Sequence, residues 1–482
     1  MGIVRMQSFR GRAVALFAVA LTATACSGGV DPKLESGSAR GWSDTSAEST
    51  PPPTAETAET VETADGAAPP LIDPSTPIGQ VSRTVVGWIN ADVNTLNPDE
   101  INAFAAPVLA QALGAAGLIT PVVQLNTSAP FTVNSYRAQG GQAELQLTTS
   151  RGVPATLDLS IDSTGKLDGI RGLATAPPET TWADVDQAIS SLGTTADSVL
   201  AARITGGSCV PVHATNAGAE LQIASVAKLY VLGALLRAVN NGTVSFDETL
   251  TITEAVKSAP SGELQNFPAG TEVTVRDAAE KMISISDNTA TDLLIDRLGR
   301  AAVENELSLM GHHDPADLTP FPTTKEVFLT GWGVQNQRAA WQSADTEGRR
   351  AILASLDDQP LDLDLQSLIS TPGSAQDVGW FATADDICNA YAGLLNGPLP
   401  DEARRILGIQ PLIELDRAQW PYVGAKSGNL PGDVIGSWLA TDAAGQDWVF
   451  ATQIESDRPI GQLENGYVFS IAQSAFGIAS AN

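Results

Sequence analysis

The sequence predicts an α+β protein with two folded parts of unequal size. Its 482 residues exceed what one compact core usually holds. Segments that alternate apolar and polar residues lie at 131–161, 198–213 and 438–452, and a largely helical stretch, residues 225–412, separates the last two. Strands on both sides of a helical middle imply one sheet closed by distant parts of the chain.

The smaller folded part is predicted over residues 73–176. Apolar residues recur at helical spacing between Gly79 and Leu113. Alternating segments then predict strands, and glycine-containing breaks predict turns. The strands are expected at 131–136, 143–147 and 155–161, and the turns at 139–142, 151–152 and 163–169. Helices followed by an antiparallel meander resemble the NTF2 or steroid-isomerase type of small α+β domain. No residue here suggests acid–base chemistry, so we expect a binding or spacing role.

The larger folded part is predicted over residues 177–482, after the break at Ala176-Pro-Pro178. Periodicity predicts a helix at each end of this part and strands next to them. The helices are expected at 182–192 and 467–478, and the strands at 198–203, 209–213, 438–441 and 448–452.

The N-terminus has the pattern of an export signal. Basic residues precede a short apolar run over 13–23, and small residues lead to Cys26. We therefore expect a signal peptide over 1–25, and the segment before Cys26 resembles a bacterial lipobox with Ala23 where a bulky residue is usual. Residues 26–72 are rich in Ser, Thr, Pro, Ala and acidic residues, which predicts a disordered stalk. These features predict a lipid anchor at Cys26 on the outer face of the cytoplasmic membrane, with ordinary secretion as the alternative.

The net charge and the few cysteine and histidine residues limit the partners and cofactors that can be expected. A formal charge of −28 would repel nucleic acid and anionic membrane surfaces, and its plainest explanation is acidic residues spread over the surface. Cys209 and Cys388 are either a disulfide or two buried free thiols. The three histidines show no metal-ligand spacing, so no metal or other cofactor is expected. We expect His213 to be structural and His312-His313 to lie in a solvated turn.

One short motif points to nucleophilic chemistry. Ser225-Val-Ala-Lys228 opens an apolar, helix-forming run, so serine and lysine lie on one face of a helix start. The helix N-terminus favours an alkoxide, and a desolvated lysine can act as its base. The spacing alone is weak, because Ser163-Thr-Gly-Lys166 has it too, in a polar turn.

Two further motifs follow in a specific order. Ser286-Asp287-Asn288 comes after an amphipathic run over 275–283, and Lys426-Ser427-Gly428 precedes the terminal strands. The order SxxK, SDN, K[ST]G resembles that of class A β-lactamases and penicillin-binding proteins. By this resemblance the larger part takes a β-lactamase/transpeptidase-like fold, an antiparallel sheet with a helical subdomain. The whole arrangement, with lipobox and stalk, resembles the LpqF/Cpe type of actinobacterial lipoproteins.

The resemblance implies a role for each residue. Ser225 is the nucleophile and Lys228 its base, Ser286 relays a proton, and Asn288 holds Lys228 and the substrate's amide. Lys426 and Ser427 bind a substrate carboxylate, and Gly428 belongs to the same motif. The backbone N–H groups of Ser225 and Asn429 form the oxyanion hole. Asp287 is expected to be structural.

The sequence departs from class A β-lactamases in one respect. Their Glu-x-x-Leu-Asn segment, whose glutamate activates the deacylating water, is missing between Ser286 and Lys426. The most similar segment is Glu326-Val-Phe-Leu-Thr330, so Glu326 is a weak candidate for that base. A polar insertion spans residues 331–360. We expect acylation, and slow release of the acyl group.

These observations predict a cell-envelope serine hydrolase that forms an acyl-enzyme on a β-lactam, ester or peptidoglycan-like substrate. The alternative is a non-catalytic envelope binding lipoprotein that keeps the fold.

Overall fold

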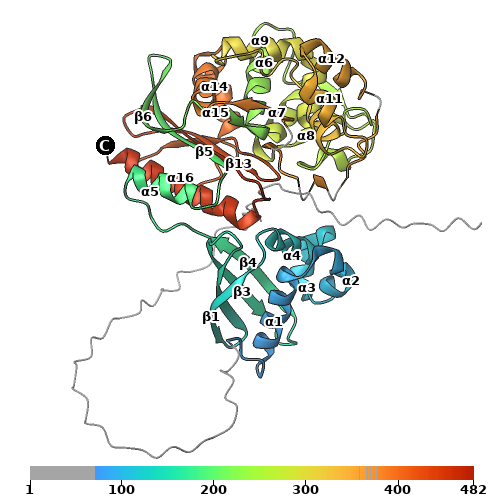
Figure 1. Ribbon diagram of the computed structural model, residues 1–482, viewed down its shortest axis with the longest axis vertical. Helices are drawn as coiled ribbons and strands as arrows, with labels where there is room; N and C mark the ends of the chain where they lie inside the picture. The colour runs from blue at the N-terminus through green and yellow to red at the C-terminus, as the bar shows by residue number, and fades with distance from the viewer. Residues whose placement is uncertain (1–70, 358, 365–366, 369–370, 375–376, 482) are drawn as a thin grey trace, which may run out of the picture. The chain divides into compact units, whose positions relative to one another are not determined.

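The computed structural model describes residues 71–481, apart from 358, 365–366, 369–370 and 375–376 (Figure 1). The predicted signal peptide, the lipidation site at Cys26 and nearly all of the predicted stalk lie outside the described residues. Among the helices that are described, none is long and apolar enough to cross a membrane.

The smaller part consists of short helices followed by a four-stranded sheet. The strands pair antiparallel in the order β1-β2-β3-β4, which is the predicted meander. The predicted turn at 163–169 is too long, because the chain turns at Gly165 and the buried Leu167 already begins β4. The elements are α1 (Pro77–Asn90), α2 (Pro98–Asn102), α3 (Pro107–Leu113), α4 (Ile119–Asn126), β1 (Thr132–Gln139), β2 (Gln142–Thr148), β3 (Pro154–Ile161) and β4 (Leu167–Ala174).

A six-stranded antiparallel sheet forms the centre of the larger part. Its path runs β11-β13-β14-β5-β6, with β12 paired to β13. Strands β5 and β14 come from opposite ends of this part and pair along their full lengths, so distant segments do close the sheet. Bounds are β5 (Ala196–Thr205), β6 (Ser208–Thr215), β11 (Tyr422–Ala425), β12 (Gly428–Leu430), β13 (Asp433–Thr441) and β14 (Asp447–Glu455).

The sheet is buried on both faces. Along β13, Ile435 and Leu439 belong to one hydrophobic core, whereas Val434 and Trp438 belong to the other. Successive side chains of a strand point to opposite faces, so one strand supplies both cores. Figure 1 shows α5 (Trp182–Ser190) and α16 (Gln462–Ser480) on one side of the sheet, and α14 (Ala384–Asn396) and α15 (Pro400–Leu407) on the other.

The remaining helices make up the predicted helical middle, and short strands connect them. The helices are α6 (Lys228–Asn240), α7 (Val275–Ser284), α8 (Asn288–Leu298), α9 (Arg300–Leu309), α10 (Thr324–Trp332), α11 (Arg338–Ser343) and α12 (Thr346–Ala354). The short strands are β7 (Leu221–Gln222), which pairs with β10 (Phe381–Ala382), and β8 (Thr249–Thr251), which pairs with β9 (Glu272–Thr274).

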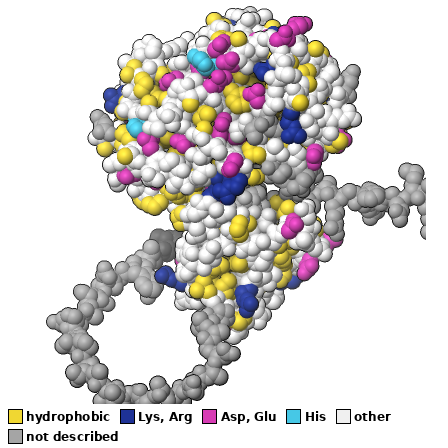
Figure 2. Space-filling model, viewed as in Figure 1, with side chains coloured by type: hydrophobic (Ala, Val, Ile, Leu, Met, Phe, Trp, Pro, Cys, Tyr) yellow, Lys and Arg dark blue, Asp and Glu magenta, His cyan; other side chains and the backbone are white. Residues whose placement is uncertain are grey.

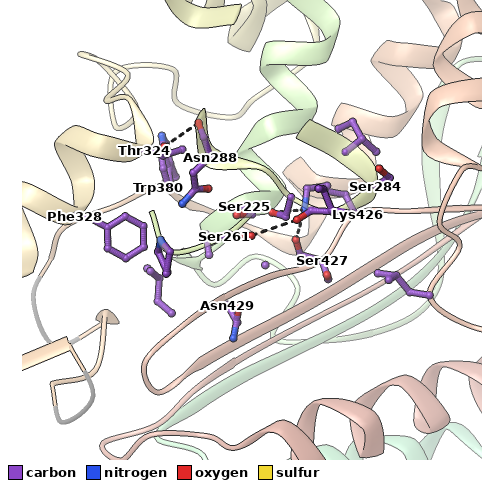
Figure 3. A pocket seen from close by; sticks show the side chains of 18 residues that line it. Ser225, Ser261, Ser284, Asn288, Thr324, Phe328, Trp380, Lys426, Ser427 and Asn429 are labelled. Carbon is purple, nitrogen blue, oxygen red and sulfur yellow. Dashed lines mark hydrogen bonds between the residues drawn. The ribbon is translucent and has the colours of Figure 1, made fainter. Parts of the chain in front are cut away.

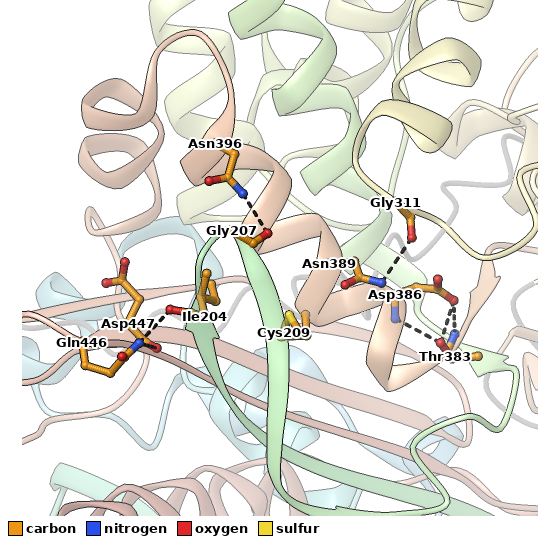
Figure 4. Close-up of a disulfide and its surroundings, with 11 residues drawn as sticks. Ile204, Gly207, Cys209, Gly311, Thr383, Asp386, Asn389, Asn396, Gln446 and Asp447 are labelled. Atoms are coloured by element: carbon orange, nitrogen blue, oxygen red, sulfur yellow. Dashed lines mark hydrogen bonds between the residues drawn. A yellow bond between two sulfur atoms is a disulfide. The ribbon is translucent and has the colours of Figure 1, made fainter.

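Cys209 and Cys388 form a disulfide between β6 and α14, with their Cα atoms 6.2 Å apart (Figure 4). This decides between the two alternatives that the sequence left open. The bond ties the edge strand of the sheet to the helix that covers it.

The distribution of charged side chains on the surface agrees with the expectation of scattered acidic residues. Acidic groups are scattered over the face seen in Figure 2 and do not gather in one patch.

The three histidines behave differently from one another. His213 is structural, because its Nε2 contacts Asp186 at 2.9 Å and its ring stacks on Trp182. The expectation of a solvated turn at His312-His313 is wrong for His312, which is 5% exposed and packs beside Tyr230.

Candidate active site

Ser225 lies in a tight turn that leads into α6. Residues 224–227 form a 3₁₀ turn, and Lys228 begins the α-helix. Side chains three residues apart eclipse one another in a 3₁₀ turn, so Lys228 Nζ lies 3.1 Å from Ser225 Oγ. Ala224, next to the serine, has a φ of 44°, a left-handed conformation that is costly for a residue with a Cβ.

Lys228 is buried and strongly hydrogen-bonded. Its side-chain nitrogen donates to Ser286 O at 2.7 Å, Ser286 Oγ at 3.0 Å and Asn288 Oδ1 at 2.7 Å. Loss of solvent lowers the pKa of Lys228 to about 7, although the negative charges of Asp287 and Asp292 act in the opposite direction. At neutral pH a large fraction of this lysine therefore carries a free lone pair, which can accept the proton of Ser225.

Ser286 connects the two lysines of the site. Its hydroxyl oxygen lies 3.0 Å from Nζ of Lys228 and 3.0 Å from Nζ of Lys426. The residue has a φ of 55°, a second left-handed backbone conformation beside the pocket. Burial lowers the pKa of Lys426 well below its usual range, and the nearby positive charge of Lys228 lowers it further.

Asp287 and Asn288 have different tasks. Asp287 is fully buried and caps α8, because its carboxylate accepts from the backbone N–H of Ala290 at 2.8 Å. It also accepts from the N–H groups of Glu263 and Leu264, which fixes the loop beside the pocket, so its role is structural, as predicted. Asn288 accepts from Lys228 through Oδ1, while its Nδ2 donates to Ala259 O at 3.0 Å.

The KSG segment lies against the serine. Lys426 and Ser427 connect β11 to β12, and Gly428 begins β12. A Cβ on Gly428 would lie 2.8 Å from Ser225 N and 2.7 Å from Ile223 O, closer than such atoms approach. Only glycine allows β12 to run this close to Ser225, and Asn429 follows directly.

These residues line one pocket, drawn in Figure 3. Ser225 lies near its centre, Lys426 and Ser427 lie on one side, and Phe328 lies on the other. The structure thus brings together all the residues predicted for the site, although Lys228 lies beneath the serine and not in the pocket wall. Among the described residues that line the pocket, none is an aspartate or a glutamate.

Glu326 is excluded as the deacylation base. Its carboxylate closes a capping box with Thr323 at the start of α10 and forms an ion pair with Arg300 at 2.7 Å. The buried carboxylate is thus occupied by these contacts at the helix start, and Glu326 does not belong to the pocket wall. The sequence pattern around Glu326 instead encodes a helix cap, with threonine three residues before glutamate.

Sequence reasoning missed a buried group behind the pocket. Thr324 lines the pocket, and its hydroxyl lies 2.9 Å from Asp292 Oδ1 and 2.8 Å from Ser258 Oγ. Burial raises the pKa of Asp292 to about 7, although hydrogen bonds from the N–H groups of Lys325 and Thr324 oppose this shift. A signal was available, since Asp292 follows Asn288 by one helical turn on α8 and so faces the same way.

Groups that could hold a metal ion lie outside this pocket. Within the part of the chain that the structure describes, two sets of histidine and carboxylate side chains have suitable spacing, and neither includes a residue of the pocket wall.

Comparison with known proteins supports the assignment of the larger part. Residues 186–339 match the model of the beta-lactamase enzyme family, and residues 72–167 match the family described as ORF 12 gene product N-terminal. No curated protein sequence matches the chain.

Solved structures similar to this chain include several β-lactamases. A β-lactamase from Sphaerobacter thermophilus DSM 20745 is 21% identical, with 62% of this chain and 98% of that chain covered and a TM-score of 0.45. PBP-A is 19% identical, with 64% and 100% covered and a TM-score of 0.42. A class A β-lactamase variant of the last common ancestor of Gram-negative bacteria is 15% identical, with 62% and 98% covered and a TM-score of 0.43. The match of residues 186–339 to the beta-lactamase enzyme family, together with the geometry around Ser225, supports a β-lactamase-like serine hydrolase in the larger part of this chain.

Proposed function

We propose that the protein acts through an acyl-enzyme at Ser225, on a β-lactam, an ester or a peptidoglycan-like carbonyl. The observation that carries this proposal is the contact of 3.1 Å between Ser225 Oγ and a lysine whose pKa is about 7. A base with a pKa near the working pH is the one that transfers protons most efficiently. No observation on the described residues favours the alternative of a non-catalytic binding protein.

The first step moves one proton and forms one bond. Lys228 Nζ takes the proton of Ser225 as Oγ attacks the carbonyl carbon, and the carbonyl oxygen becomes an oxyanion. The N–H groups of Ser225 and Asn429 would hold that oxyanion. The tight approach of Gly428 to Ser225 N supports this placement, because it brings the two N–H groups to the same region.

Collapse of this intermediate breaks the bond to the leaving nitrogen or oxygen, which needs a proton. Ser286 Oγ lies within 3.0 Å of both lysine nitrogens, so it can donate its own proton to the leaving atom and take one from Lys228. The result is an acyl-serine and a neutral leaving group. Asn288 would keep Lys228 in place through Oδ1 and use its remaining N–H for the substrate's amide.

Lys426 and Ser427 would bind a carboxylate of the substrate. Burial gives Lys426 a lowered pKa, and a carboxylate bound beside it would favour its protonated form. This supports substrates with a carboxylate near the scissile bond.

The organisation of the full chain is also proposed. Residues 1–25 would be a signal peptide, Cys26 a lipid anchor, 26–72 a stalk, and 177–482 the hydrolase. The helices and the four-stranded meander of residues 73–176 support an NTF2-like or steroid-isomerase-like arrangement. The protein would then act in the cell envelope as a lipoprotein of the LpqF/Cpe type.

A labelling experiment tests the nucleophile. The full chain is incubated with a fluorescent penicillin, and the adduct is followed on a denaturing gel and by mass spectrometry. We expect one adduct on Ser225 that is lost in Ser225→Ala. Ser163→Ala is the matched control, because Ser163 has the same spacing to a lysine at Lys166 and should label normally. Absence of any adduct, or an adduct that persists in Ser225→Ala, would overturn the assignment.

A further inference from the structure

Three side chains from two separate loops form a cluster outside the Ser225 pocket. Glu220 precedes β7, while His313 and Asp317 lie in the loop between α9 and α10. A ring nitrogen of His313 and one carboxylate oxygen from each of Glu220 and Asp317 lie within 4.8 Å of one another. All three residues are exposed, so an ion can reach them from solvent.

The ring of His313 is fixed by a buried carboxylate. Asp386 accepts from the backbone N–H of His313 at 2.7 Å and contacts its Nδ1 at 2.7 Å, and the Asp386 side chain is 1% exposed. Since a carboxylate accepts, Nδ1 is assigned the proton and Nε2 keeps a free lone pair. A carboxylate behind the far nitrogen is the arrangement that orients histidines which bind metals.

The support for His313 is itself rigid. Asp386 also accepts from Thr383 Oγ1 at 2.7 Å within the capping box of α14, and Asn389, on the same helix, donates to Gly311 O at 3.2 Å (Figure 4). Helix α14 therefore holds the loop that carries His313 at two points. A site built on such a support keeps its ligand geometry before an ion arrives.

The two carboxylates face each other without a lysine or arginine paired to either among the described residues. Neither Glu220 nor Asp317 forms an ion pair with lysine or arginine in the described part of the chain. Their carboxylate oxygens lie within 4.8 Å of each other, so the two groups repel each other when both are charged. A divalent cation between them would remove this repulsion.

His312 gives a second indication. It is 5% exposed, and its Nε2 has no hydrogen-bond partner among the described residues. Its ring stacks on that of His313 with centroids 5.2 Å apart, and one of its nitrogens lies within 4.8 Å of ligand atoms of His313 and Asp386. A buried polar group without a partner is rare, and here it adjoins the same cluster.

We propose that His313, Glu220 and Asp317 bind a divalent transition-metal ion of the Zn²⁺ type, with water completing the coordination. One imidazole and two carboxylates suit Zn²⁺, whereas Mg²⁺ prefers oxygen ligands alone. The ion would join the loop before β7 to the loop after α9. Because β7 leads directly to the turn of Ser225, the ion would stabilise the fold without touching the substrate.

Calorimetric titration of the tag-free full chain with Zn²⁺, after treatment with a chelator, tests this proposal. We expect one saturable site whose affinity falls at least tenfold in His313→Ala and in Asp317→Asn. Asp386→Asn should weaken binding about 10- to 100-fold although it leaves the three ligands in place. His213→Ala is the matched control, since His213 also has a carboxylate partner, Asp186, and it should bind Zn²⁺ like the wild type.

Three results would overturn the metal site: no saturable Zn²⁺ binding, unchanged affinity in His313→Ala, or loss of the site in His213→Ala. Mg²⁺ serves as the probe of selectivity, and equal affinity for Mg²⁺ would contradict the imidazole ligand. The same samples are labelled with the fluorescent penicillin. Labelling of Ser225 should persist in all variants, so failure of the metal site and failure of the proposed hydrolase are separate outcomes.

Discussion

The side-chain nitrogen of Lys228 lies 3.1 Å from the hydroxyl oxygen of Ser225, in a place where solvent does not reach it. The contact depends on a local feature, the spacing of three residues between the serine and the lysine. Its chemistry depends on a tertiary feature, the burial of the lysine side chain. Burial gives the lysine a pKa of about 7, and this value sets how the proposed acylation responds to pH.

Acylation of Ser225 should become faster as the pH rises through 7. Lys228 accepts a proton only when it is neutral, and its neutral fraction is small below a pKa of about 7 and nearly complete above it. Between pH 5.5 and 8.5 we expect a rise of about 30-fold in the second-order rate of labelling, since the neutral fraction changes by that factor. Stopped-time labelling with fluorescent penicillin measures it. A rate that is flat over this range would show that Lys228 is not the base.

Gly428→Ala should impair acylation more than stability. The added Cβ would lie 2.8 Å from Ser225 N, so β12 must move away from the serine, and the two N–H groups of the proposed oxyanion hole separate. Loss of one oxyanion donor lowers the rate by about 10²–10³-fold. Gly218→Ala is the control, because nothing lies within 4 Å of a Cβ there. Equal rates of labelling in the two variants would argue against this position of the oxyanion hole.

The acyl group should leave Ser225 slowly. The described residues of the pocket wall include no carboxylate to activate water. Intact-mass spectrometry after removal of free penicillin should show the adduct persisting for many minutes. Rapid return to the unmodified mass would reveal a deacylating group that this geometry does not supply.

Glu326→Gln should lower the stability of the fold without changing the rate of deacylation. Loss of the charge that pairs with Arg300 should lower the free energy of unfolding by about 1–3 kcal/mol, because the Glu326 side chain is buried. The lifetime of the adduct should change less than about twofold. Glu254→Gln is a matched control, because Glu254 pairs with Lys257 at the surface and should cost less than about 1 kcal/mol. Chemical denaturation and the mass time course give the two readouts.

The disulfide should contribute substantially to stability. Replacement of both Cys209 and Cys388 by serine removes a link between residues 179 apart in sequence. We expect the free energy of unfolding to fall by about 2–4 kcal/mol, because the unfolded chain gains conformational freedom. Denaturation curves of the variant, and of the wild type with and without reductant, measure this loss. The reduced wild type should match the variant, and a difference below about 0.5 kcal/mol in both would contradict the expectation.

Local sequence patterns were enough to predict much of the architecture. Alternating runs identified the meander of the smaller part and the terminal strands, because side chains of a strand alternate between faces whatever the rest of the chain does. The contact between Ser225 and Lys228 was also predictable, since residues three apart meet within a single helical turn. Asp287 was expected to be structural, and the structure gives it the specific task of capping α8.

The surroundings of these residues depend on how distant segments pack together, which local patterns could not predict. The pKa of Lys228 depends on burial by segments remote in sequence, and Ser286 meets both lysines because α7, α8 and β11 converge. The local pattern offered Glu326 only as a weak candidate for the base, and packing pairs it with Arg300. The pairing of the cysteines and the cluster around His313 depend in the same way on which loops meet. The contact between Ser225 and Lys228 could therefore be predicted from the sequence. Its chemistry depends on desolvation and long-range pairing, which follow from packing between distant segments and leave no local sequence pattern.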